Sequence, residues 1–203
     1  MKLYYAKGTC SLAVRIAIHE MNLPCEFEAV NLKTKQTESG ADFLKINVKG
    51  QVPTVLLDNN EILTENATIH QYLADLHQAT TLLPAIGDFK RYRVLEWLNF
   101  ITTELHKRFG PLFDSNVPET LKNENFIPTL KNKFKIVDQR LSQNKFLMGD
   151  QYTLPDAYLY VMIVWLRHFK IDLSEWPNLA RYFAELNQRK SIQQALKEEG
   201  LTG

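Results

Sequence analysis

The sequence predicts a two-domain protein, in which an α/β domain over residues 1–80 precedes an all-helical domain over residues 88–203. Three observations support this fold class. Short β-prone segments occur together with helical ones only in the first 80 residues, whereas the remainder carries helical apolar stripes. The intervening segment 81–87 contains Pro84 and Gly87, which are typical of a linker. A length of 203 residues accommodates one large domain or two small ones.

The first domain begins with a βαβ pattern. Residues 2–6 are short, apolar and β-prone. Residues 11–21 are mostly apolar with a polar side that includes Arg15, which is typical of a helix. Residues 25–30 alternate between apolar and polar side chains, the period of a strand. Strand, helix and strand within 30 residues form a βαβ unit.

The domain continues with a hairpin and a helix. Residues 52–58 and 61–64 are apolar runs on either side of Asn59 and Asn60. Asn tolerates the positive φ of tight turns, so this pattern predicts a β-hairpin. Residues 66–77 carry one apolar face and predict a helix, while the stretch before the hairpin is expected to be irregular.

Apolar stripes predict several helices in the second domain. Residues 154–169 are apolar on nearly all sides, which indicates a buried central helix. Thr153 and Asp156 form a capping box at its start, with Asp in place of the usual Glu. The other expected helices cover residues 88–109, 130–141, 177–186 and 191–199.

Composition excludes several classes of function. Lys+Arg is 24 and Asp+Glu is 23, so the formal net charge of +1 provides no global field for nucleic acid or an anionic membrane. No apolar run approaches the roughly 20 residues that span a bilayer. No secretory signal is visible, and the two cysteines have neither a disulfide framework nor metal-site spacing. The sequence therefore predicts a cytoplasmic protein without a metal.

Cys10 and Val52-Pro53 are the first candidate functional positions. Cys10 lies where the first strand meets the first helix, and a helix N-terminus stabilises a thiolate. The alternative explanation is that Cys10 is only a small buried apolar residue, and Cys25, in a strand, is expected to be a core residue. No C-x-x-C is present, because Lys7 stands where a redox partner would be. Pro53 enters a strand, either as an ordinary trans proline or as a cis proline that turns the preceding backbone toward a ligand.

Two polar groups allow both a structural and a functional reading. Thr64, Glu65 and Asn66 lie where a strand ends and a helix begins. They either cap the helix, or leave its N–H groups for a ligand carboxylate while Glu65 holds a ligand ammonium. In the long helix, a polar row formed by Asn99, Thr103 and His106 is either a solvated face or one wall of a ligand site.

Several short motifs occur in order along the whole chain. They are Tyr4–Leu12, Gly50–Pro53, Leu63–Asn66 with Ile69 and Tyr72–Asp75, Glu104–His106, Phe146–Asp150 with Thr153 and Asp156-Ala157, and Trp176–Leu179. Together these motifs resemble the beta class of bacterial glutathione transferases. The resemblance implies a thioredoxin-like first domain of βαβ-αββα order, a helical second domain and a homodimer. It also implies an enzyme that joins reduced glutathione, its co-substrate, to small hydrophobic electrophiles.

The resemblance assigns candidate roles by position in the first domain. Cys10 would meet the glutathione sulfur, and Val52, before a cis Pro53, would pair its backbone with the cysteinyl part. Glu65 and Asn66 would hold the γ-glutamyl end. Asn66 stands where Ser is usual, and its larger side chain is expected to alter affinity.

Further roles follow for both domains. Lys35 and Lys107 would lie near the glycyl and thiol ends, and Asn99 and His106 would close the site. Tyr5 and His106 are the catalytic candidates beside Cys10. The remaining expected contacts, toward the ligand of the partner subunit, are Thr103 and Glu104.

Thr103 stands where an acidic residue is common, so the link to the partner's ligand is expected to rest on Glu104. An electrophile needs an apolar pocket, for which the sequence offers Phe109, Phe113, Tyr158 and Trp165. Two other activities fit the same fold. One is a glutathione-dependent thiol reductase acting through a Cys10 mixed disulfide, and the other is a binding protein without turnover.

Overall fold

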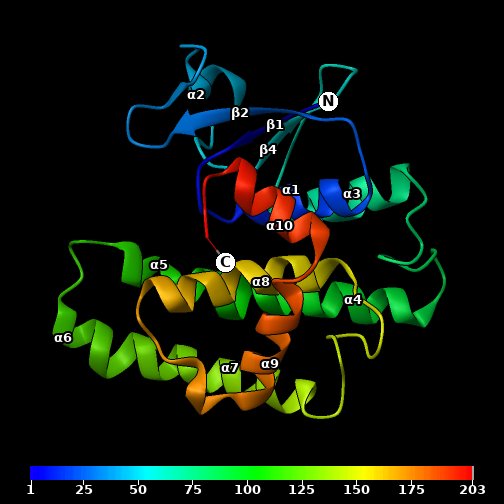
Figure 1. The fold of residues 1–203 in the computed structure, drawn as a ribbon. Coiled ribbons are helices and arrows are strands. Elements are labelled where there is room, and N and C mark those ends of the chain that lie inside the picture. The colour runs from blue at the N-terminus through cyan, green and yellow to red at the C-terminus, as the bar shows by residue number, and fades with distance from the viewer. Residues whose placement is uncertain (203) are drawn as a thin grey trace. The chain divides into compact units, whose positions relative to one another are not determined.

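The computed structural model describes residues 1–202 and divides the chain into two compact units (Figure 1). Unit 1 contains Met1–Thr80 together with the C-terminal segment that begins at Gln188, and unit 2 contains Thr81–Asn187. A mixed α/β arrangement in unit 1 and an all-helical arrangement in unit 2 confirm the predicted fold class.

The C-terminal segment differs from the sequence expectation, which assigned residues 88–203 to the helical domain. Helix α10 (Lys190–Glu198) packs on helix α1 (Ser11–Glu20) within unit 1. Its buried face supplies Ile192, Ala195 and Leu196. The apolar stripe of α10 predicted a helix correctly, but a stripe does not state which partner covers it.

Unit 1 is built on a five-stranded sheet of order β3-β2-β1-β4-β5. Strand β1 is parallel to β2 and antiparallel to β4, and the other pairs are antiparallel. The short strand β3 was not expected from the sequence. The strands are β1 (Lys2–Tyr5), β2 (Glu26–Asn31), β3 (Gln36–Thr37), β4 (Thr54–Leu56) and β5 (Ile62–Thr64).

The two faces of this sheet carry different cores, because successive side chains of a strand point to opposite sides. Leu3 of β1 joins a cluster with residues of α1 and of helix α3 (Asn66–Leu76). Tyr4 joins a second cluster with Phe43 of the short helix α2 (Phe43–Ile46). Figure 1 shows α1 and α3 together near the sheet, with α10 beside α1.

Unit 2 consists of helices and turns. The expected helix over residues 88–109 continues to Phe113 and contains a π-helical segment at Ile101–His106. Helix α8 is buried along most of its length, as its all-round apolar sequence predicts. The elements are α4 (Phe89–Phe100), η1 (Ile101–His106), α5 (Lys107–Phe113), α6 (Glu119–Leu121), η2 (Lys122–Phe126), α7 (Ile127–Leu141), α8 (Leu154–His168), η3 (Leu173–Glu175) and α9 (Pro177–Leu186).

The predicted capping box at the start of α8 is confirmed. The carboxylate of Asp156 accepts the backbone N–H of Thr153 at 2.7 Å and that of Leu147 at 3.0 Å. It also accepts the hydroxyl of Tyr182, from α9, at 2.7 Å. Asp156 therefore joins the start of α8 to the preceding turn and to a second helix.

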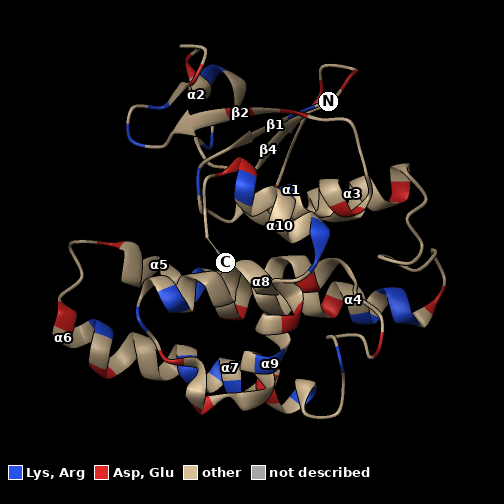
Figure 2. Cartoon of the chain, in the orientation of Figure 1, with Lys and Arg blue, Asp and Glu red and all other residues tan. Residues whose placement is uncertain are grey.

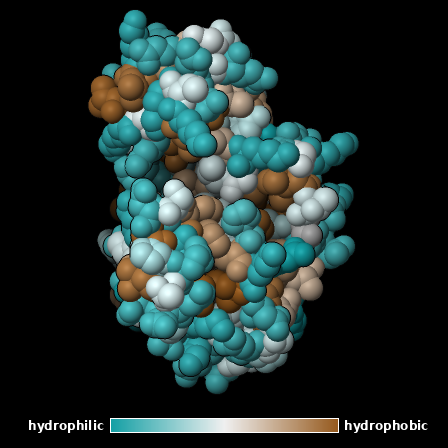
Figure 3. Space-filling model, turned by 90° about the vertical axis from the view of Figure 1, so that its left-hand side faces the viewer, coloured by the Kyte–Doolittle hydropathy of each residue, from teal (hydrophilic) through white to brown (hydrophobic). Residues whose placement is uncertain are grey.

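Charged residues of both signs are distributed along the helices, without a large patch of one sign in the view of Figure 2. On the face drawn in Figure 3, hydrophilic residues predominate and hydrophobic ones form small separate groups. Among residues 1–202, none of the helices has the length and apolar character needed to cross a membrane.

Candidate functional site

Cys10 lies directly before α1, at the N-cap position of that helix. Its side chain is 8% exposed, and Sγ donates to the carbonyl oxygen of Val52 at 3.3 Å. The thiol thus lies at a helix N-terminus, where the partial positive charge favours a nearby anion. The structure places the cysteine and Val52 in direct contact, a pairing that the sequence did not predict.

The Val52-Pro53 peptide bond is cis. Neighbouring side chains bind the loop that carries it: Asn47 Nδ2 donates to the Gln51 carbonyl at 2.9 Å. Lys35 Nζ donates to the Gly50 carbonyl at 2.8 Å. Lys35 was expected near the glycyl end of the ligand, and in this structure its ammonium lies on the loop that presents Val52.

The N-terminus of α3 meets the same region. Asn66 is buried, and its Nδ2 donates to the Cys10 carbonyl at 2.7 Å, while no described group binds its Oδ1. Glu65 precedes the helix with φ of 73°, in the left-handed region. The side chain of Asn66 therefore joins the start of α3 to the start of α1, a role beyond the cap and the ligand contact that the sequence offered.

His70 reinforces this junction one turn further along α3. Its Nδ1 lies 2.8 Å from the Asn66 carbonyl oxygen and its Nε2 lies 3.2 Å from the Ala13 carbonyl oxygen of α1. Complete burial lowers the pKa of His70 to about 4, despite the opposing effect of the two carbonyls. The ring is therefore neutral at pH 7 and has one N–H for two acceptors.

Tyr5 and Ser11 belong to the same Tyr4–Leu12 motif as Cys10 and contact other groups. The ring of Tyr5 lies 4.0 Å from the Arg15 guanidinium, on the side of β1 that faces α1. Ser11 is buried, and its Oγ accepts the N–H of Ala6 at 3.2 Å. The catalytic role expected for Tyr5 stays a prediction without a supporting contact.

The loop before Cys10 receives a contact from the C-terminal segment of the chain. Glu199 Oε2 accepts the N–H of Gly8 at 2.8 Å, and Oε1 lies 3.4 Å from Arg15 Nε. The side chains of Glu199 and Arg15 are both buried. Burial raises the pKa of Glu199, against the opposing effects of Gly8 and Arg15. Sequence reasoning missed this contact, since an acidic residue near a terminus carries no local signal of burial.

Within unit 2, the polar row on α4 and η1 divides into two kinds of residue. Asn99 and Thr103 are exposed, and Thr103 Oγ1 donates to the Asn99 carbonyl at 3.1 Å. His106 is half-buried, and its Nδ1 is hydrogen-bonded to the Tyr158 hydroxyl. Lys107 is exposed. A π-helical segment changes the helical period here, so a row defined by α-helical spacing does not remain on one face.

Glu104 is already paired inside its own unit. Its carboxylate lies 2.7 Å from Lys133 Nζ and 3.0 Å from Arg108. These hydrogen bonds, first that to Lys133 and then that to Arg108, lower the pKa of Glu104. The Glu104 carboxylate, which was expected to bind the ligand of the partner subunit, is therefore paired with two cations of its own chain in this structure.

The aromatic residues expected to bind an electrophile are mostly core. Phe109, Tyr158 and Trp165 are buried, whereas Phe113 is half exposed and packs edge-on against Trp165. Of the four candidates, only Phe113 offers much surface to a ligand. Of the apolar pocket that the sequence predicted, only the ring of Phe113 is therefore accessible to a ligand.

Comparison with known proteins identifies the class of protein. Residues 1–75 match the family model for the glutathione S-transferase N-terminal domain, and residues 73–190 match that for the C-terminal domain. The chain belongs to the glutathione S-transferase family.

Individual relatives narrow the class. The chain is 38% identical to glutathione S-transferase GstA of Escherichia coli O157:H7, covering 99% of this chain and 100% of that protein. A sphingomonad glutathione S-transferase complexed with glutathione is 39% identical with a TM-score of 0.94, covering both chains in full. A bacterial beta class enzyme from Sphingomonas chungbukensis is also 39% identical, with a TM-score of 0.95 over both full chains. These findings confirm the resemblance to the bacterial beta class.

Proposed function

We propose that this protein conjugates reduced glutathione to small hydrophobic electrophiles. The observation that carries the proposal is the chain of contacts from Val52 through Cys10 to Asn66. It brings the cis-proline loop and the N-termini of α1 and α3 to one place. The structural relative from a sphingomonad, whose title names bound glutathione, supports the choice of ligand.

The groups at this place complement the charges of glutathione, which has two carboxylates and one ammonium. The N–H groups at the start of α3 suit the γ-glutamyl carboxylate, and the Glu65 carboxylate suits the ammonium. The backbone of Val52 suits the cysteinyl part. Lys35, half-buried on the adjoining loop, is the proposed cation for the glycyl carboxylate.

In conjugation, the thiol of glutathione gives up its proton and the resulting thiolate attacks the electrophile. For an aromatic halide, a carbon–sulfur bond forms and halide leaves. The N-terminus of α1 stabilises the negative sulfur, and Cys10 acts beside it as a hydrogen-bonding group. The contributions expected from Asn99, Thr103, Glu104, His106 and Lys107 stay predictions.

A second activity is favoured by the position of the Cys10 thiol at a helix N-terminus. Its thiolate would attack the glutathione sulfur of a substrate–glutathione mixed disulfide, form a Cys10–glutathione mixed disulfide and release the substrate thiolate. A second glutathione thiolate would then attack the mixed disulfide and regenerate Cys10, with oxidised glutathione as the product. Cys25 has no such environment, because burial raises its pKa to about 11.

Steady-state turnover of glutathione with an aromatic halide tests the main proposal. Glu65→Gln should raise the KM for glutathione about tenfold, the effect of losing a charge-assisted bond worth ~1.5 kcal/mol. Glu61→Gln, an exposed acidic residue of the adjacent hairpin, is the matched control and should leave KM unchanged. Glutathione binding without turnover would favour the carrier, and turnover of disulfides alone would favour the reductase.

Cys10→Ala separates the two catalytic activities. The variant should lose mixed-disulfide exchange, because no exchange centre remains, and should only slow conjugation, in which glutathione supplies the nucleophile. Cys25→Ala is the control for removal of a thiol. Exchange that survives in Cys10→Ala would contradict the assigned role of this cysteine.

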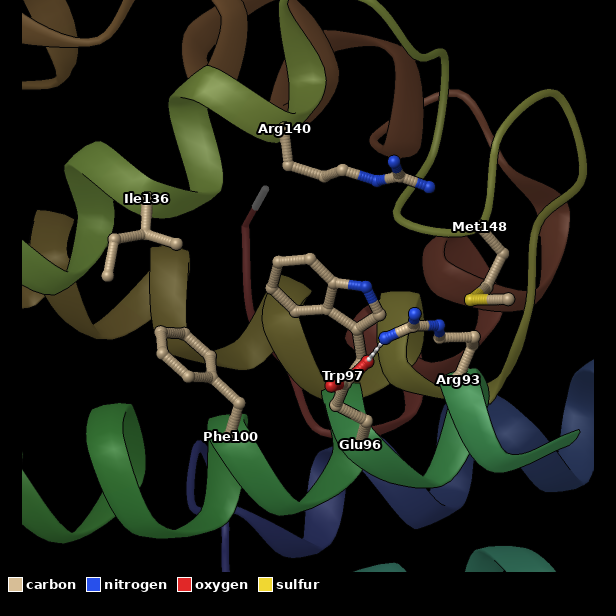
Figure 4. Close-up of a pocket in the computed structure, with 7 residues that line it drawn as sticks. All are labelled: Arg93, Glu96, Trp97, Phe100, Ile136, Arg140 and Met148. Carbon is tan, nitrogen blue, oxygen red and sulfur yellow. Dashed lines mark hydrogen bonds and ion pairs between the residues drawn. The ribbon is translucent and has the colours of Figure 1, made fainter. Parts of the chain in front are cut away.

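We further propose that the protein is a cytoplasmic homodimer. Support comes from a groove of about 500 Å³ between α4 and α7, which is lined by four apolar side chains together with Arg93, Glu96 and Arg140 (Figure 4). Trp97 and Phe100 of α4 face Ile136 of α7, and Met148 closes one end. Cys10 and Cys25 form no disulfide, which suits a reducing compartment.

Light scattering tests the dimer. The wild-type chain should have twice the monomer mass, and Phe100→Glu should shift it to the monomer because a carboxylate would replace one of the apolar side chains of the groove. Glu124→Gln, an exposed substitution outside the groove, is the control. A wild-type monomer at all concentrations would refute the assignment.

A further inference from the structure

A lysine ammonium lies on the carboxylate that we assign to the ammonium of glutathione. Lys49 Nζ is 2.8 Å from Glu65 Oε1 and donates to Thr64 Oγ1 at 2.9 Å. The two acceptors belong to consecutive residues, at the end of β5 and just before α3. An ammonium group at this point is therefore held by one carboxylate oxygen and one hydroxyl oxygen.

The surrounding structure fixes the backbone of Glu65. Its φ of 73° and ψ of 119° are unusual for a residue with a side chain, and such a conformation persists only where neighbouring contacts hold it. On one side, Thr64 pairs with Thr54 of β4. On the other, the side chain of Asn66 is bonded to the Cys10 carbonyl. The backbone position from which the Glu65 side chain extends is therefore fixed, whichever ammonium its carboxylate binds.

Lys49 belongs to the loop that leads into the cis proline. Its N–H donates to Asn47 Oδ1 at 3.0 Å, which holds its backbone, whereas its long side chain is held only through Nζ. The Lys49 side chain is 51% exposed and that of Glu65 is 63% exposed. Ion pairs this exposed contribute little, so the Lys49 ammonium can be exchanged for another ammonium.

We propose that Lys49 is an internal competitor for the ammonium group of glutathione. In the absence of ligand, its Nζ occupies the position between Glu65 and Thr64, and the γ-glutamyl ammonium displaces it on binding. The inference rests on the proposed function, in which Glu65 binds that ammonium. Lys49 thereby acts through Glu65 and lowers the affinity for glutathione without touching the reacting sulfur.

The competition predicts that removal of the Lys49 ammonium raises the affinity for glutathione. Lys49→Met should lower the Kd and KM for glutathione by about two- to fivefold, the fold-change that corresponds to a weak surface ion pair. The kcat at saturating glutathione should stay within twofold of the wild type. The gain should shrink as salt is added, because exposed charges are screened. Lys45→Met removes an exposed lysine of α2 and serves as the matched control.

Two further measurements isolate the ammonium exchange. In a Glu65→Gln background, Lys49→Met should have no effect, since the shared carboxylate is gone. A glutathione analogue without its amino group should bind equally to the wild type and Lys49→Met, because it does not displace the lysine. Lys49→Gln is a second variant that should reproduce the gain, and circular dichroism checks that each variant is folded.

The outcomes separate this inference from the function on which it rests. Wild-type protein that fails to bind glutathione would defeat the proposed function. Wild-type binding together with an unchanged or raised Kd in Lys49→Met would overturn only the role of Lys49. An equal gain in the Lys45→Met control would also overturn it, by showing a general effect of positive charge.

Discussion

Replacement of Asp156 by Ala should cost this protein much of its stability. The carboxylate has no exposed surface and accepts four hydrogen bonds, two of them from Thr153. Burial raises the pKa of Asp156, while these donors oppose the rise. Removing the acceptor leaves the Leu147 N–H, the Thr153 N–H and the Tyr182 hydroxyl unsatisfied in the interior.

The magnitude follows from those orphaned donors. Each buried group without a partner costs about 1–3 kcal/mol, so three of them give a loss of about 4 kcal/mol after partial relaxation. For a chain of this size that corresponds to a fall in Tm of about 10 °C. Urea unfolding followed by circular dichroism measures the free energy of unfolding directly.

Asp172→Ala is a matched control. Asp172 also caps a helical turn, by accepting the Ser174 N–H at 3.0 Å, but it is exposed. Its loss should cost no more than about 1 kcal/mol, because water replaces the bond. A loss below 1 kcal/mol in Asp156→Ala, or one equal to that of the control, would refute the reasoning. The Kd for glutathione, measured where the variant is folded, should not change.

Three other perturbations test buried groups of unit 1. The pKa of His70 is lowered from 6.5 to about 4, so the native state favours the neutral form of the ring. Stability from this group is complete above pH 6.5 and is lost as the pH falls toward 4. His70→Leu should therefore lose about 3 kcal/mol less than the wild type between pH 7 and pH 4 in urea unfolding; equal losses would contradict this. In Cys10→Ala, the remaining thiol has a pKa of about 11, and its alkylation at pH 8 should be about 100-fold slower than that of free cysteine. A rate like that of free cysteine would contradict the raised pKa of the half-buried Cys25. Glu199→Leu removes one of the two carboxylates that pair with the buried Arg15 charge, leaving only Glu198. It should destabilise by about 2 kcal/mol, against no change for the exposed Glu61→Leu.

Elements whose cause is local were predictable from the sequence. The first strand, α1 and β2 follow from short apolar patterns, and the capping box needs only Thr153 and Asp156 at the right spacing. The burial of α8 follows from its all-round apolar side chains. In each case the determining residues lie within a few positions of one another, so periodicity and local hydrogen bonds are sufficient.

The candidate site was predictable in part. The approximate positions of Cys10, Val52 and Asn66 came from motifs, but their mutual contacts did not. Asn66 was expected to face a ligand, and in the structure its amide group binds the Cys10 carbonyl, 56 residues away in the chain. The buried contacts of His70 were not predicted, because a single histidine among the apolar residues of a helix produces no periodic pattern.

Only the tertiary structure decided which surfaces meet. An amphipathic stripe requires α10 to be covered but is equally satisfied by either unit, and packing on α1 places it in unit 1. The same packing buries Glu199 against Gly8 and Arg15, a contact that joins the two ends of the chain. Local sequence thus determined the elements and their apolar faces, because those depend on neighbours in the chain. Pairings between distant side chains depend on shape and burial across many residues at once, and no short pattern contains that information.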